Sequence, residues 1–262
     1  MSTPFASAAP YYARHRPPYP PEFHERLADR FALDGSQTLL DLGAGPGTAC
    51  LPLAPLAEHV YAVDPEPAML AEGRGAAAAR GLTNITWLTG DDAGIGRLCL
   101  PRIDLCVIGS AFHLMDRTRV LDDLDPLLAH RAGIAIVTPL DRPGEPEPPW
   151  RAVVDEVRER FLGPGAPPGE PPAAYWETLG DLLAKSAFSR VETHVWEQPI
   201  RCTAEQLAGL QLSFPYSCPA VLGARADAFE AVLCRALLEH DPGDAFERTL
   251  RVGAVFATRP RR

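Results

Sequence analysis

The chain has 262 residues, of which 46% are apolar, and it carries a formal net charge of −9. This length and composition suit one α/β domain with additions. The negative charge argues against nucleic acid and anionic membranes as partners, because both attract basic surfaces. The six cysteines include no C-x-x-C pair, so we expect free thiols and no metal site. The N-terminus has no apolar core of signal-peptide length, which predicts a cytoplasmic protein.

Apolar runs that are typical of strands alternate with helix-like segments over the first half of the chain. The strands are expected at residues 37–42, 59–64, 85–89, 103–109 and 133–138. The helices between them are expected at residues 46–57, 67–81 and 117–130. Near-continuous apolar strands joined by helices predict a mostly parallel sheet with helices on both faces.

The alternation is interrupted after Thr138. Two proline-rich loops, at 141–149 and 163–172, surround an amphipathic helix expected at 150–162. The remaining elements are expected to be a helix at 173–188, a strand at 191–197, a helix opened by the capping box Thr203–Gln206, a helix at 220–239 and a strand at 250–259.

We therefore expect an α/β fold built on a doubly wound, mostly parallel, seven-stranded sheet with helical cap insertions. The predicted divisions are an N-terminal segment (1–36), a core (37–138), a cap insertion (139–175), a core helix and strand (176–198), a second helical cap insertion (199–247) and a final core strand (248–262). The two insertions are candidates for a cap over a site at the edge of the sheet.

The stretch LLDLGAGPGT, from Leu39 to Thr48, ends a predicted strand in an aspartate and three glycines. A ligand at the carboxyl ends of parallel strands requires a sharp turn, and glycine permits both the turn and a close approach of the backbone. A dinucleotide fingerprint would need its third glycine at Thr48, but that glycine is Gly47. The pattern from Asp41 to Gly47 resembles motif I of class I S-adenosylmethionine (SAM)-dependent methyltransferases, which implies a Rossmann-like sheet with SAM as cofactor.

Acidic residues follow the next two predicted strands. Asp64 ends the second strand, where the resemblance implies that it holds the ribose hydroxyls, and an ionised carboxylate can accept both hydrogen bonds. Asp64 could also cap the next helix, because Pro65 follows it. After the third strand, the resemblance implies that one acid accepts from the adenine amino group; Asp91 is favoured over Asp92.

The N-terminal YARHRPPYP, Tyr12–Pro20, looks like the entry segment of small-molecule methyltransferases similar to the trans-aconitate methyltransferase group. That resemblance implies that residues 1–36 cover the cofactor and that Arg16 faces its methionine carboxylate, with Tyr12 and Tyr19 lining the mouth. The alternative is that Arg16 is only a surface charge.

The resemblance assigns the SAM site to one set of residues distributed over the first half of the chain. The set is Tyr12, Arg16, Asp41, Gly43, Ala44, Gly45, Gly47, Asp64, Pro65, Met69, Asp91, Asp92, Ser110, Ala111 and Phe112. Asp41 is expected to reach the methionine end of SAM, or otherwise to satisfy N–H groups of the glycine loop.

His113 follows the fourth predicted strand by four residues, in the loop expected to face the transferred methyl group. Neutral histidine is a natural base near neutral pH, so His113 is the candidate general base or substrate orienter. The alternative role is a wall residue that contacts the cofactor or backbone.

The predicted substrate is a small molecule. The loop Gly109–His113 lacks the Asn/Asp-Pro-Pro-aromatic stretch of enzymes that methylate base or glutamine amides. We expect a moderately apolar acceptor, for instance a secondary metabolite. A SAM-binding protein that catalyses a rearrangement or cyclisation without methyl transfer is the alternative, and both predict the same cofactor site.

Overall fold

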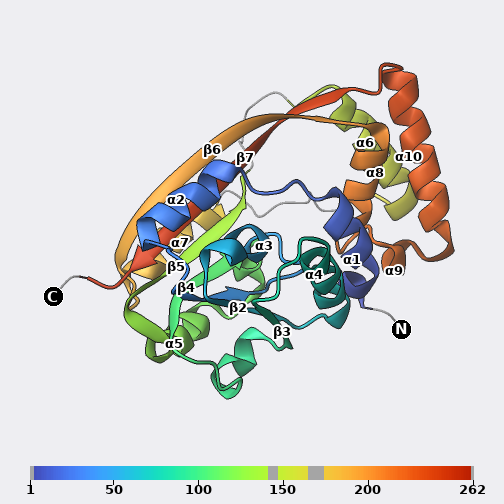
Figure 1. Cartoon of the computed structure of the whole chain (residues 1–262). Coiled ribbons are helices and arrows are strands. Elements are labelled where there is room, and N and C mark those ends of the chain that lie inside the picture. The colour runs from blue at the N-terminus through green and yellow to red at the C-terminus, as the bar shows by residue number, and fades with distance from the viewer. Residues whose placement is uncertain (1–2, 141–146, 165–173, 261–262) are drawn as a thin grey trace. The chain divides into compact units, whose positions relative to one another are not determined.

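The computed structural model describes residues 3–140, 147–164 and 174–260, with residues 174–177 described by their backbone alone (Figure 1). Most of the two predicted proline-rich loops, 141–149 and 163–172, lies outside these residues. The chain divides into two compact units. The helical unit comprises Met1–Pro17, Arg142–Glu170 and Glu197–Leu250, and the sheet unit comprises Pro18–Asp141, Pro171–Trp196 and Arg251–Arg262.

A seven-stranded sheet has the order β3-β2-β1-β4-β5-β7-β6. Its strands are β1 (Thr38–Leu42), β2 (His59–Asp64), β3 (Ile85–Thr89), β4 (Ile103–Gly109), β5 (Leu128–Pro139), β6 (Arg190–Cys202) and β7 (Phe246–Thr258). Strands β1 to β5 pair in parallel, whereas β7 runs antiparallel to β5. The predicted α/β fold with a doubly wound, mostly parallel sheet is confirmed.

Helices flank this sheet (Figure 1). They are α2 (Pro21–Phe31), α3 (Cys50–Leu53), α4 (Pro67–Ala79), α5 (Arg117–Leu127) and α7 (Ala174–Ala184), with short 3-10 helices η1 (Ala54–Leu56), η2 (Asp92–Arg97) and η3 (Phe112–Leu114). Strands β1 and β4 carry almost unbroken runs of buried residues, as strands covered on both faces must. Their side chains, among them Leu40, Cys106 and Ile108, form the centre of the core.

Several predicted boundaries were wrong. The helix expected at 46–57 is reduced to the single turn of α3, followed by η1. One reason is that the glycine loop continues to Ala49, and the other is that Pro52 and Pro55 interrupt the segment that follows. The helix expected to reach His130 ends at Leu127. Strand β5 begins at the next residue, Leu128, which is five residues before the predicted start of this strand. The helix expected to reach Phe188 ends at Ala184, and β6 and β7 are longer than predicted.

The helical unit contains α1 (Pro4–His15), α6 (Trp150–Leu162), α8 (Ala204–Leu212), α9 (Pro219–Leu222), the 3-10 helix η4 (Gly223–Arg225) and α10 (Ala226–His240). Helices α6 and α8 both pack against α10 (Figure 1). The capping box of Thr203 and Gln206 opens α8 as predicted. The single helix expected at 220–239 is divided, because Gly223 adopts a φ of +59° and ends α9.

The apolar faces of these helices form a second core. Trp150, Leu207, Phe229 and Leu233 are all buried in it. The indole N–H of Trp150 donates to the carbonyl of Glu247 at 3.1 Å, so the burial of this ring leaves its polar atom satisfied.

The described part of the chain contains neither a candidate membrane-spanning helix nor a candidate metal site. No helix in these ranges is long and apolar enough to cross a bilayer, and no group of three histidines, cysteines or acids there is arranged to hold a metal ion. All six cysteines are free thiols.

Candidate cofactor and active site

The glycine loop lies at the point where the strand order of the sheet reverses. Strand β1 pairs in parallel with β2 on one side and with β4 on the other, and the loop follows its carboxyl end. In doubly wound sheets this switch point is where ligands bind. The sequence from Asp41 to Gly47 therefore occupies the position that a nucleotide-like ligand requires.

The three glycines of this loop all have positive φ angles: +73° at Gly43, +54° at Gly45 and +84° at Gly47. A Cβ atom on Gly43 would lie 2.4 Å from the Cβ of Ala111, and one on Gly47 would lie 2.8 Å from the ring of Trp87. At Gly45 a Cβ would meet no described atom within 4 Å. Two glycines thus allow close packing under the loop, while Gly45 presents backbone that a ligand can approach.

Asp64, at the end of β2, binds the glycine loop directly. Its Oδ2 accepts from the backbone N–H of Gly45 at 2.8 Å, and its Oδ1 accepts from the N–H of Glu66 at 2.8 Å. Burial raises the pKa of Asp64, whereas these two hydrogen bonds lower it. The alternative role as helix cap is wrong: Glu66 is the N-cap of α4, and Pro67 is its first residue.

Asp41, within β1, is only 1% exposed. Its Oδ2 accepts from the backbone N–H of Cys50, the first residue of α3, at 3.1 Å. This hydrogen bond does not involve a glycine of the loop. Its Oδ1 is buried with no hydrogen-bond partner among the described residues. Burial, with a smaller contribution from the charge of Asp64, raises the pKa of Asp41 to about 7.

This raised pKa predicts a pH dependence of stability in the ligand-free protein. Between about pH 4 and pH 7 the folded state holds a proton on Asp41 that the unfolded state has released. The proton on Asp41 therefore stabilises the folded state at low pH. This stabilisation, roughly 2–4 kcal/mol, is lost as the pH rises through about 7. Urea unfolding of the wild type and Asp41→Asn at pH 5 and pH 8 measures it. Asparagine cannot ionise, so the wild type should lose more stability than the variant; parallel pH profiles would contradict the assignment.

The two acids after β3 have different surroundings. Asp92 accepts from the N–H of Asp116 and from the guanidinium of Arg119, each at 3.0 Å. Asp91 has an exposed side chain. Asp92 thus connects η2 to the start of α5, and the expected contact of Asp91 with adenine stays a prediction. Nearby on the chain, Met69 is buried in α4.

The loop after β4 carries the remaining predicted residues of the sheet unit. Ser110 has a φ of +53°, donates its N–H to the carbonyl of Val137 at 2.8 Å, and lies 3.0 Å by its Oγ from the hydroxyl of Tyr19. Ala111 and Phe112, which belong to the same loop, have buried side chains. His113 lies in η3 with an exposed side chain, and partial desolvation lowers its pKa below the ordinary value.

Tyr12 and Arg16 belong to the helical unit. The Nε of Arg16 donates to the Oγ of Ser213 at 2.9 Å, and its guanidinium lies 4.9 Å from the ring centre of Tyr12 and 4.1 Å from that of Phe214. Arg16 is therefore half-buried between aromatic rings. Its contact with a methionine carboxylate stays a prediction.

Sequence reasoning missed Trp87 of β3 as a support of the site. The same ring that meets Gly47 would lie 2.4 Å from a Cβ on Gly73 of α4. The signal was a tryptophan near the end of a strand, with glycines in two other segments, but nothing in the sequence pairs them. Their contact depends on how β3 and α4 fold together.

Comparison with known proteins agrees with this geometry. Residues 39–130 match the family described as a methyltransferase domain. Over these residues the chain is similar to methyltransferase domains. The matched region runs from β1 to the start of β5, and it includes the glycine loop, both acid-bearing strand ends and His113.

Individual relatives and solved structures match longer stretches of the chain. An uncharacterized methyltransferase of Mycobacterium tuberculosis strain H37Rv is 33% identical over 137 residues, 52% of this chain and 52% of that protein. The chain thus spans about half the length of its mycobacterial relatives. The structure of a candidate type II methyltransferase from Anaeromyxobacter dehalogenans shares its fold, with a TM-score of 0.58, 24% identity and coverage of 93% and 97%. The 4+2 cyclase SpnF has a TM-score of 0.51, 17% identity and coverage of 91% and 81%.

Proposed function

We propose that the protein is a SAM-dependent methyltransferase that acts on a small molecule. The observation that carries this proposal is the bridge between Asp64 and the N–H of Gly45 at the switch point of the region that matches a methyltransferase domain. This bridge brings together the acid and the glycine loop that a nucleoside with two ribose hydroxyls requires.

Residues of the sheet unit fit three parts of SAM. Asp64 would hold the ribose, and Asp91 the adenine amino group. The unpartnered Oδ1 of Asp41 would accept from the ammonium group of the methionine part. For Arg16 and Tyr12, which belong to the helical unit, contact with the methionine carboxylate stays the expectation drawn from the sequence.

SAM, when bound, supplies a methyl group that is already activated on a sulfonium. The chain then has to orient the acceptor, exclude water and take up a proton where the acceptor carries one. The lowered pKa of His113 keeps its imidazole neutral at pH 7, which is the form that accepts a proton. We assign His113 the role of general base, acting on a hydroxyl, amine or activated carbon.

Two features support a small-molecule acceptor. The loop Gly109–His113 lacks the proline-aromatic stretch of amide-methylating enzymes, and the segment Tyr12–Pro20 is similar to the trans-aconitate methyltransferase group. A moderately apolar acceptor, such as a secondary metabolite, fits these features. The six free thiols support a reducing compartment, the cytoplasm.

The test combines binding with product analysis. Calorimetry should show SAM binding at micromolar concentration, roughly −7 to −8 kcal/mol. With a panel of small hydroxyl, amine and active-methylene compounds, mass spectrometry should detect S-adenosylhomocysteine and a methylated product in equal amounts. Absence of SAM binding would contradict the proposal. Conversion of a compound without S-adenosylhomocysteine would instead establish a rearrangement or cyclisation.

A further inference from the structure

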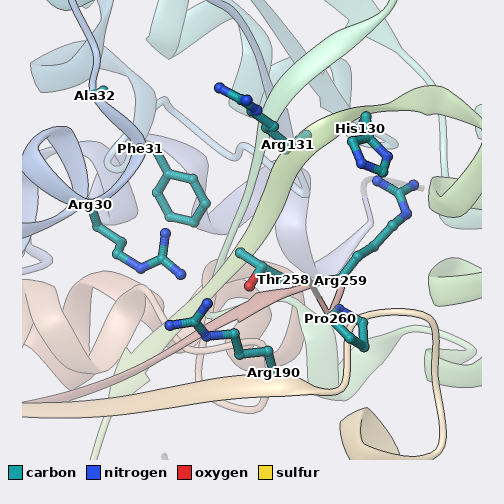
Figure 2. A pocket seen from close by; sticks show the side chains of 10 residues that line it. Arg30, Phe31, Ala32, His130, Arg131, Arg190, Thr258, Arg259 and Pro260 are labelled. Carbon is teal, nitrogen blue, oxygen red and sulfur yellow. The ribbon is translucent and has the colours of Figure 1, made fainter. Parts of the chain in front are cut away.

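A cavity lies in the sheet unit, away from the glycine loop (Figure 2). Its volume is about 770 Å³. It is lined by the end of α2, the beginning of β5, the first residue of β6, and the last residue of β7 with the two residues that follow it. Because β5 runs parallel to β1, its beginning marks the opposite edge of the sheet from the glycine loop. The cavity is therefore separate from the proposed SAM site.

Four arginines line this cavity, and two of them have carboxylate partners. Arg30 pairs with Glu192 at 2.7 Å, and Arg259 pairs with Asp125 at 2.7 Å. Among the described residues, no hydrogen bond or ion pair engages the guanidinium of Arg131 or of Arg190, and both side chains are exposed.

The four arginines line one cavity but point in different directions (Figure 2). Figure 2 shows the guanidinium groups of Arg30 and Arg190 approaching each other beside Thr258, while Arg259 extends toward His130. Arg30 and Arg190 both lower the pKa of Glu192, so both positive charges lie near this carboxylate, although only Arg30 forms an ion pair with it.

The charge of this cavity opposes that of the chain. Four guanidiniums face two carboxylates, an excess of two positive charges, in a protein whose net charge is −9. Helix α2 ends at the cavity, and its carboxyl-terminal dipole opposes an anion by about half a charge. The arginine excess is larger than this opposing dipole, so the cavity favours an anion.

We propose that this cavity binds a small ligand with two phosphate groups. One guanidinium group can donate hydrogen bonds to two phosphate oxygens at once. Among the described residues no hydrogen bond or ion pair engages the guanidiniums of Arg131 and Arg190, so both can bind phosphate in this way. The buried Thr258 adds a hydroxyl at its wall. The volume lies within the range of roughly 300–1,000 Å³ typical of small-ligand sites. A nucleic acid would require a long basic stripe, which a chain of this net charge does not favour.

The test is calorimetric titration of the full chain with inorganic pyrophosphate at low ionic strength. We expect binding that weakens as salt is added. Arg131→Gln with Arg190→Gln should weaken it at least about tenfold, because each lost guanidinium removes charge-assisted hydrogen bonds. The matched control is Arg80→Gln with Arg201→Gln, which removes the same charge from exposed residues outside the cavity. This control should bind pyrophosphate nearly as the wild type does.

Three results would overturn the proposal. One is absence of pyrophosphate binding at millimolar concentration to the folded wild type. Another is an equal loss of affinity in both double variants, which would show only an effect of net charge. The third is binding of a short single-stranded oligonucleotide without pyrophosphate binding. Thermal unfolding of both double variants shows whether they are folded, and Arg131→Lys with Arg190→Lys, which keeps both charges, should retain part of the affinity.

Discussion

Replacing Asp64 with alanine is expected to weaken the binding of SAM and S-adenosylhomocysteine about 100-fold or more. The variant would lose the acceptor of two ribose hydroxyls, each worth roughly 1.5–3 kcal/mol when the acceptor is charged. It would also lose the carboxylate that holds the N–H groups of Gly45 and Glu66. Titration calorimetry with S-adenosylhomocysteine measures the effect.

Asp104→Ala is the matched control for this variant. The Oδ2 of Asp104 also accepts from a backbone N–H, that of Thr38 at 2.9 Å, but this contact lies at the beginning of β1. Asp104→Ala should therefore bind S-adenosylhomocysteine nearly as the wild type does. Asp64→Asn keeps the size of the side chain but loses its charge, and an intermediate loss is expected. Unchanged affinity in Asp64→Ala would remove Asp64 from the site.

Replacing His113 with alanine is expected to lower kcat about 10²–10⁴-fold while SAM affinity stays nearly intact. The reason is that the variant lacks the proposed base but keeps the residues that would hold the cofactor. Because the base must be neutral, the wild-type rate should fall as the pH drops through the pKa of His113. Desolvation places that pKa below its ordinary value of about 6.5. The variant should lose this acidic limb of the kcat profile.

Two further variants decide between base and wall residue. His113→Gln keeps a hydrogen-bonding amide but cannot take up a proton at neutral pH, so it should be nearly as slow as alanine. Near-wild-type kcat in His113→Gln would contradict the base assignment, and a change confined to KM would indicate a wall residue. Leu114→Ala is the matched control, because Leu114 is the exposed neighbour in the same 3-10 helix.

The sequence determined the elements whose signal is local. The runs 59–64, 85–89 and 103–109 are strands with the predicted bounds. Near-continuous apolar residues suit β2 and β4, which are covered on both faces, whereas β3 is a half-buried strand at the end of the sheet. The amphipathic helix at 150–162 and the capping box at Thr203 also depend on neighbours within one or two turns.

Tertiary contacts decided the rest. The segment from Leu128 to Ala132 has no strand pattern, but Leu128 pairs with Ile103 of β4 and so extends β5 toward the opposite edge of the sheet. That extension places Arg131 at the cavity, where residues from four separate segments meet. The sequence marked Asp64 as a candidate ligand, but its hydrogen bond to Gly45 appears only when β1 and β2 pair. Contacts between distant segments arise from packing and hydrogen bonding across the fold, which no local pattern encodes.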